Sequence, residues 1–172
     1  MRTATRRCTR RARTKPDRAT AVTPPPRIVL DTNVCLDLFV FREPLCSHLL
    51  SALQRGAVQA VTREDCRDEW RRVLHYPQLP IDATRRLRAN AAFDAWVRLL
   101  PAPDATPDDD AALPRCADPD DQMFLQLALA SGARWLLSKD NALLTLDRRT
   151  RASGLFAICL PQQWSVAAAA SP

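Results

Sequence analysis

The stretch that decides the fold is Arg27-Ile28-Val29-Leu30-Asp31-Thr32-Asn33. Three consecutive apolar residues, two of them β-branched, are typical of a short strand that is buried on both faces, as in a parallel sheet. Thr32 and Asn33 then supply side chains that favour the start of a helix. We therefore expect a strand over 27–31, followed at once by a helix whose apolar stripe carries Val34, Leu38 and Phe41.

Strand and helix patterns alternate along the rest of the chain. Further strands are expected at 57–61, 133–138 and 155–160, and helices at 44–54, 62–75, 81–100, 118–130 and 142–146. Thr62 is expected to cap its helix with Asp65 as capping-box partner, and Asp118 to cap the helix that continues with Pro119. This alternation predicts an α/β fold, a three-layer α/β/α sandwich around a central, mainly parallel sheet.

The net charge of +6, from 25 Lys and Arg against 19 Asp and Glu in 172 residues, is concentrated at one end. Residues 1–26 hold eight basic residues and one acidic residue, Asp17, whereas the remainder holds 17 basic and 18 acidic residues. The segment has no apolar periodicity and ends in three prolines, so we expect a disordered, Arg- and Pro-rich arm that suits RNA or DNA phosphates. A GC-rich genome and a start site assigned too far upstream would produce the same arginine bias.

We expect the arm at 1–26, one globular domain at 27–162 and a flexible tail at 163–172. The 47% apolar and 26% charged residues match a globular protein. No stretch approaches the roughly 18 apolar residues of a spanning helix, so no membrane contact is expected. The six cysteines never fall two to four residues apart, which gives no support for a structural zinc site and fits a reducing, cytoplasmic setting.

Several carboxylates are predicted at one edge of the sheet. Asp31 and Asp140 both follow strands, and ligands bind at the carboxyl ends of strands in open α/β sheets. The alternative is that each only caps a helix. Asp121 heads the apolar stripe of the helix expected at 118–130, with Asp118 and Asp120 beside it. Asp120 and Asp121 would exchange roles if that helix began one residue later.

Glu69 borders the core-facing stripe of the helix expected at 62–75. Helix geometry alone favours a salt bridge at the rim, whereas a carboxylate turned inward would need a cation. Four carboxylates on one edge would repel one another unless cations neutralised them, and hard oxygen ligands select Mg²⁺ or Mn²⁺. Such a site performs metal-assisted phosphoryl chemistry, which predicts a phosphodiester substrate.

Four motifs, in order between about residues 27 and 160, resemble those of PIN-domain ribonucleases. The likeness is closest to bacterial members described as toxin components of toxin–antitoxin systems. The motifs are Val29-Leu30-Asp31-Thr32-Asn33, Asp68-Glu69-Trp70-Arg71-Arg72-Val73-Leu74, Asp118-Pro119-Asp120-Asp121-Gln122-Met123-Phe124-Leu125 and Gly132-Ala133-Arg134-Trp135-Leu136-Leu137-Ser138-Lys139-Asp140.

The resemblance implies a Mg²⁺- or Mn²⁺-dependent endoribonuclease that acts on RNA. It implies a quartet of catalytic and metal-binding acids, Asp31, Glu69, Asp121 and Asp140. It also implies that Thr32, Asn33 and Ser138 orient the carboxylates or a bound water. A homodimer and a neutralising antitoxin protein are the implied partners. The chain departs from the family pattern in its arginine-rich leader and at Lys139-Asp140-Asn141.

Other classes of protein fit the residues less well. A receiver-like, Mg-binding signalling domain would need a phosphorylatable aspartate after the strand at 57–61, and Val61 ends that strand without one. A haloacid-dehalogenase-type phosphatase would need a second aspartate where Asn33 stands. A non-catalytic RNA- or antitoxin-binding module of PIN type would keep the acids without cleaving RNA.

Overall fold

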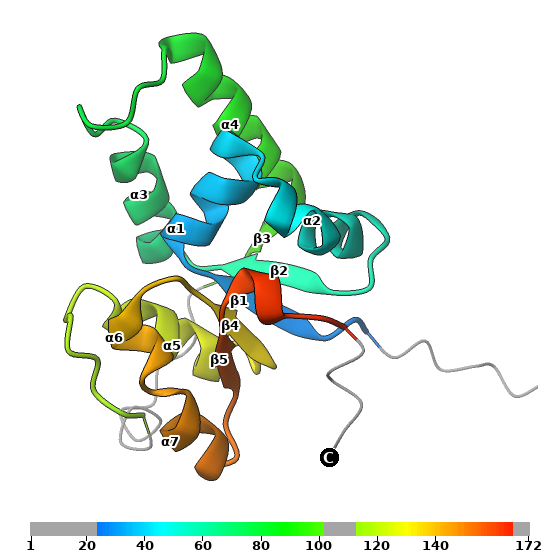
Figure 1. Cartoon of the computed structure of the whole chain (residues 1–172), viewed down its shortest axis with the longest axis vertical. Helices are drawn as coiled ribbons and strands as arrows, with labels where there is room; N and C mark the ends of the chain where they lie inside the picture. The colour runs from blue at the N-terminus through cyan, green and yellow to red at the C-terminus, as the bar shows by residue number, and fades with distance from the viewer. Residues whose placement is uncertain (1–23, 102–112, 167–172) are drawn as a thin grey trace, which may run out of the picture.

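The computed structural model describes residues 24–101 and 113–166 (Figure 1). The predicted arm, apart from its last three prolines, and the predicted tail from residue 167 onward lie outside the described residues. Five strands form one sheet in the order β3-β2-β1-β4-β5, and every neighbouring pair is parallel. The strands are β1 (Arg27–Leu30), β2 (Gln59–Thr62), β3 (Val97–Leu99), β4 (Trp135–Leu137) and β5 (Ala157–Cys159).

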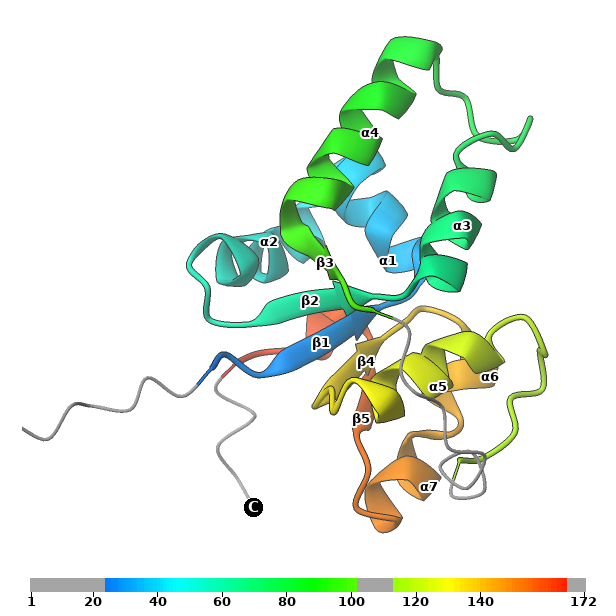
Figure 2. The ribbon, with the colours of Figure 1, turned by 180° about the vertical axis from the view of Figure 1, so that it is seen from behind.

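Helices cover both faces of the sheet, which confirms the predicted three-layer sandwich (Figures 1 and 2). Successive residues of β1 face opposite layers, because Ile28 and Leu30 belong to one apolar core and Val29 to the other. One layer holds α1 (Thr32–Cys35), the π-helical turn η1 (Leu36–Phe41), the 3-10 turn η2 (Pro44–Cys46), α2 (Ser47–Gln54), α3 (Glu64–Val73) and α4 (Ala83–Trp96). The other holds α5 (Gln122–Ala130), α6 (Asn141–Leu144) and α7 (Asp147–Ala152).

The helix expected after β1 is present, but its second half is π-helical. Val34 and Leu38 are buried as predicted, whereas Phe41 is 43% exposed. The wider turn of a π-helix, with i→i+5 hydrogen bonds, changes which residues share a face and so moves Phe41 out of the stripe. Arg42 then stops the helix with a left-handed backbone, φ 55°.

Strand β3 was not expected. The helix predicted at 81–100 ends at Trp96, and the next three residues pair in parallel with β2. Val97 is buried while Arg98 and Leu99 are exposed, so this is a short edge strand whose few residues carry no strand signal of their own. Helix α7 was not expected either, because the short segment Asp147–Ala152 contains five polar residues and shows no apolar stripe.

Two predicted helix caps are wrong. Helix α3 begins at Glu64 because β2 continues through Thr62, whose hydroxyl donates to the Arg63 carbonyl. The Asp65 carboxylate binds the Arg63 guanidinium instead of forming a capping box. Helix α5 begins three residues later than Pro119, with Asp121 at the N-cap position, because the preceding residues form a turn.

The domain continues past its predicted end at residue 162. After the 3-10 turn η4 (Pro161–Gln163), Trp164 is only 3% exposed. Its ring lies edge-on to Trp135, with centroids 5.7 Å apart, and stacks on His48 at 6.2 Å. The boundary at 162 is therefore too early, because a buried tryptophan belongs to the core.

The described helices do not include one that could span a bilayer. The longest of them, α4, has 14 residues, and none combines the necessary length with the necessary apolar character.

Candidate metal centre

Asp31 lies at the carboxyl end of the central strand. Its backbone N–H donates to the Leu137 carbonyl at 3.0 Å, which continues the β1–β4 ladder by one residue. Its side chain is buried, and Oδ2 accepts hydrogen bonds from the Ser138 hydroxyl and the Asn33 amide, each at 2.5 Å. Asp31 stands at the N-cap position of α1 but forms no side-chain capping bond. Capping alone therefore does not account for this residue.

Ser138 and Asn33 connect the ends of β1 and β4. Ser138 is fully buried, and its hydroxyl accepts from the Asp140 backbone N–H at 2.8 Å while donating to Asp31. Asn33 Oδ1 accepts from the Lys139 backbone N–H at 3.1 Å, while its amide group donates to Asp31. Both residues therefore contact the carboxylate of Asp31.

Asp140 is exposed at the start of α6. Its Oδ1 accepts from the Ala142 backbone N–H at 2.6 Å, so this aspartate does cap a helix. Capping does not remove it from the acid cluster, because its charge raises the pKa of Asp121. Thr32, the first residue of α1, is buried beside Asp31.

Asp121 is the carboxyl group on which the charges of the other aspartates act. Desolvation by burial, and after it the charges of Asp31, Asp140, Asp118 and Asp120, raise its pKa from 3.8 to about 7. Coulomb interactions fall with distance, so carboxylates from three separate segments of the chain lie near one another here. Burial also raises the pKa of Asp31, and the hydrogen bond from Ser138 opposes that rise.

The segment before α5 is fixed by Gln122, which sequence analysis missed. Its Oε1 accepts from the Cys116 N–H at 2.8 Å, and its Nε2 donates to the Pro114 carbonyl at 3.4 Å. Asp118 accepts from the Asp120 N–H at 2.9 Å, and both aspartates are exposed. The sequence contains no signal for the role of Gln122, because its partners are backbone groups six and eight residues earlier.

Glu69, the remaining acid of the predicted quartet, forms an ion pair within α3. Its carboxylate pairs with the guanidinium of Arg72, one turn further along α3, and its side chain is 18% exposed. This is the rim salt bridge that helix geometry favours.

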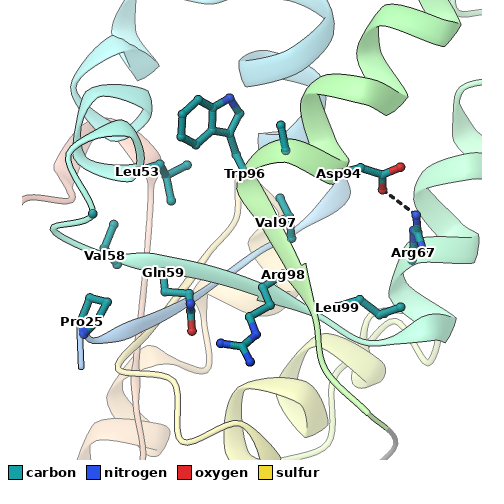
Figure 3. A pocket seen from close by; sticks show the side chains of 12 residues that line it. Pro25, Leu53, Val58, Gln59, Arg67, Asp94, Trp96, Val97, Arg98 and Leu99 are labelled. Atoms are coloured by element: carbon teal, nitrogen blue, oxygen red, sulfur yellow. Dashed lines mark hydrogen bonds and ion pairs between the residues drawn. The ribbon is translucent and has the colours of Figure 1, made fainter. Parts of the chain in front are cut away.

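A cavity of about 590 Å³ lies elsewhere, along the edge strand β3 (Figure 3). Its lining is mostly apolar and includes Trp96, Val97 and Leu99. The only ion pair drawn among its residues joins Arg67 to Asp94. The residues that line this cavity do not include Asp31, Asp121 or Asp140, so the acid cluster is a separate site at the strand ends.

A family comparison identifies the family of the chain. The sequence pattern of the PIN domain matches residues 27–142, which contain the whole acid cluster and most of the sheet. The chain belongs to the PIN domain family. PIN domains are typically metal-dependent nucleases that bind Mg²⁺ or Mn²⁺. Comparison with curated proteins found no match.

The donor chemistry of this PIN domain fits a hard divalent cation. In the described part of the chain, no three His, Cys, Asp or Glu side chains are arranged to hold a metal ion. The aspartates nevertheless raise the pKa of Asp121 by mutual repulsion, and a bound cation would remove that repulsion. Carboxylate oxygens are the ligands that Mg²⁺ and Mn²⁺ prefer. Asp31, Asp121 and Asp140 are the candidate ligands, and their described side-chain positions do not form a three-ligand site.

Sequence analysis also missed an ion pair next to the cluster of this PIN domain. Asp37, in η1, is buried and pairs with Lys139, which lies between Ser138 and Asp140. The sequence did contain a signal for Asp37, because it is the one charged residue in the apolar run from Val34 to Phe41. An acid in such a run needs a partner, but nothing local identifies a lysine 102 residues away.

The raised pKa of Asp121 predicts how the stability of the metal-free PIN domain depends on pH. The folded pKa of about 7 lies above the unfolded value, so the folded state binds more protons between about pH 4 and 7. This contribution to the free energy of unfolding is therefore lost as pH rises through that window. Allowing for the partial exposure of the group, we expect a loss of about 1–2 kcal/mol.

Urea denaturation in EDTA at pH 5 and pH 7.5 would measure this loss. Asp121→Asn should lack it, whereas Asp94→Asn, which removes an exposed partner of Arg67, should retain it. The same pH dependence in wild type and Asp121→Asn would show that Asp121 titrates normally.

Proposed function

We propose that this chain is a Mg²⁺- or Mn²⁺-dependent endoribonuclease that hydrolyses RNA phosphodiester bonds, and that it is the toxin component of a toxin–antitoxin system. One observation carries the enzymatic part of the proposal. Asp31, Asp121 and Asp140 come from three segments of the chain, and burial of Asp121, together with the negative charges of Asp31, Asp140 and their neighbours, raises the pKa of Asp121 to about 7. Such repulsion is unfavourable to folding and is relieved by binding a cation.

The residues of the chain have separable tasks in this reaction. Ser138 and Asn33 hold the Asp31 carboxylate in one orientation through their bonds to Oδ2. Asp121 must lose its proton to become a ligand, so cation affinity should increase as pH rises toward neutrality. When bound, Mg²⁺ or Mn²⁺ supplies an activated water and stabilises the charge of an in-line displacement at phosphorus. Activating the water and stabilising the charge both need a cation whose carboxylate ligands are held in place before the substrate binds.

The quartet implied by the resemblance includes Glu69 as its fourth acid. For Glu69 to act as a ligand, its carboxylate must leave Arg72, whose side chain is 61% exposed and can be solvated once the pair is broken. Arg72 could then interact with the phosphate backbone of RNA. Thr32, Asp118 and Asp120 are proposed as supporting residues at the same edge.

The toxin role, the antitoxin partner and the homodimer rest on the resemblance to the bacterial toxin group. The choice of RNA over DNA rests on the same likeness. The eight basic residues in 1–26 would attract any polyanion, so they support a nucleic-acid substrate without favouring RNA over DNA.

A second candidate is a non-catalytic RNA- or antitoxin-binding module with a PIN fold. The observation that favours it is the Glu69–Arg72 pair, since an acid already neutralised by arginine does not need a metal.

Metal-dependent cleavage of RNA distinguishes the two candidates. Purified protein incubated with total RNA and Mn²⁺ should give discrete fragments whose ends can be mapped, and EDTA should abolish them. Single-stranded DNA of matched length serves as the control for substrate class. Binding of RNA without Mn²⁺-dependent fragments would support the non-catalytic module and contradict the proposed activity.

A further inference from the structure

Besides a longer contact of 3.5 Å from the Asn33 amide to the Ser138 hydroxyl, three interactions join the turn between β4 and α6 to the segment after β1. The first is the hydrogen bond between Ser138 and Asp31. The second joins the Lys139 backbone N–H to Asn33, at 3.1 Å. The third is an ion pair, in which Lys139 Nζ lies 2.8 and 2.7 Å from the two carboxylate oxygens of Asp37. All three partners lie between residues 31 and 37.

The ion pair differs from the other described salt bridges in its burial. The Asp37 side chain is 9% exposed and that of Lys139 is 38% exposed, whereas pairs such as Arg151–Asp147 on α7 are more open. A carboxylate buried to this degree is costly unless a cation faces it. Asp37 also lies in a π-helical turn, a rare conformation that is found frequently at functional sites.

We propose that Asp37 and Lys139 are positioning residues, which set the Asp31 and Asp140 carboxylates for the divalent cation. Lys139 precedes Asp140 and follows Ser138, so its side chain controls the turn that carries both. Asp37 lies in the helical segment that begins directly after Asp31. The affinity for the cation should therefore depend on a pair that does not itself contact the cation. This inference rests on the proposed metal-dependent function.

A purely electrostatic effect and a positioning effect predict opposite changes in cation affinity when the charge of Lys139 is removed. If the pair acted only through long-range charge, removing the lysine cation would strengthen binding of a divalent cation, and removing the Asp37 carboxylate would weaken it. If the pair positions the turn, both changes should weaken binding. Residues that orient ligands without contacting the metal typically change metal affinity about 10–100-fold.

Removing the charges of both Asp37 and Lys139 distinguishes a positioning role of the pair from a role in stability alone. Either single substitution leaves one buried or half-buried charge without its partner and should lower Tm, whereas Asp37→Asn/Lys139→Met leaves none and should recover much of the loss. Under a positioning role, cation affinity stays weak in the double variant even though Tm recovers.

The experiment is a titration of the full chain with Mn²⁺, in which the EPR signal of free Mn²⁺ gives Kd, with Tm measured on the same samples. We expect Lys139→Met and Asp37→Asn each to raise Kd about tenfold, the double variant to remain about tenfold weaker than wild type, and Lys139→Arg to stay close to wild type. Arg151→Met, which removes an exposed ion pair on α7, is the matched control and should leave Kd unchanged.

The outcomes separate this inference from the function on which it rests. Wild-type protein that binds no Mn²⁺ would contradict the proposed function. Wild-type binding together with equal or tighter binding by Lys139→Met would overturn the positioning role alone, as would recovery of Kd in the double variant. If the single variants do not fold, the double variant decides between weakened and unchanged binding.

Discussion

Asp31→Asn should reduce Mn²⁺-dependent RNA cleavage by roughly 10³-fold, more than the 10–100-fold typical of residues that only orient a ligand. The substitution keeps the size of the side chain and its place beside Ser138, but it removes the negative charge at the centre of the cluster. A neutral amide cannot replace a carboxylate as a ligand for a hard divalent cation. The loss should appear in kcat even at saturating Mn²⁺, because the substitution impairs the cleavage step itself and not only the affinity for the cation.

The same variant offers a second readout that does not depend on activity. Asp31 is the charge that contributes most to the raised pKa of Asp121, so Asp31→Asn should move that pKa down from about 7. An NMR titration of the Asp121 carboxyl in the absence of metal would measure it. Asp94→Asn, which alters a carboxylate beside β3, is the control and should affect neither cleavage nor titration. Cleavage by Asp31→Asn at the wild-type rate would exclude the acid cluster as the active site.

Trp70→Ala should destabilise the domain by about 3–5 kcal/mol, which is a large part of the roughly 5–15 kcal/mol that holds a domain folded. Trp70 is 1% exposed, and its ring stacks on Phe93 with centroids 5.2 Å apart and lies edge-on to Phe39 at 6.3 Å. Its indole N–H donates to Asn90 Oδ1 at 3.0 Å. Alanine would leave both a cavity and an amide oxygen without its donor.

Thermal unfolding followed by circular dichroism would measure the change, with an expected fall in Tm of about 10 °C or more. Trp96→Ala is a matched control because Trp96 is 37% exposed at the end of α4, and its loss should lower Tm only slightly. Trp70→Phe should lie between the two. A Trp70→Ala variant as stable as Trp96→Ala would mean that the three-ring cluster does not hold α3 against α4.

Local patterns were sufficient to predict four of the five strands and the position of two acids at the strand ends. The apolar run Ile28-Val29-Leu30 and the run at 135–137 are short, bounded and buried on both faces, so their strands and their carboxyl ends could be located from the chain alone. The placement of Asp31 and Asp140 at one edge follows directly from parallel pairing. The family likeness rests on the same local motifs.

Features that depend on distant partners could not be predicted in this way. Strand β3 exists because its residues pair with β2, and the sequence Val97-Arg98-Leu99 continues a helical pattern equally well. Asp65 does not form the expected capping box, because its carboxylate accepts a hydrogen bond from the guanidinium of Arg63. Lys139 has its ion-pair partner 102 residues away, so no window of sequence contains both.

The position of β1 in the middle of the sheet has a consequence for the growing polypeptide. β1 pairs first with β2, which follows about 30 residues later, but its other neighbour is β4, made more than 100 residues after it. Ser138, which holds the Asp31 carboxylate, and Asp140 are therefore among the last parts of the matched region to leave the ribosome. A nascent chain that has exposed Asp31 and Asp121 still lacks Asp140. The acid cluster can therefore form only after most of the domain has been synthesised.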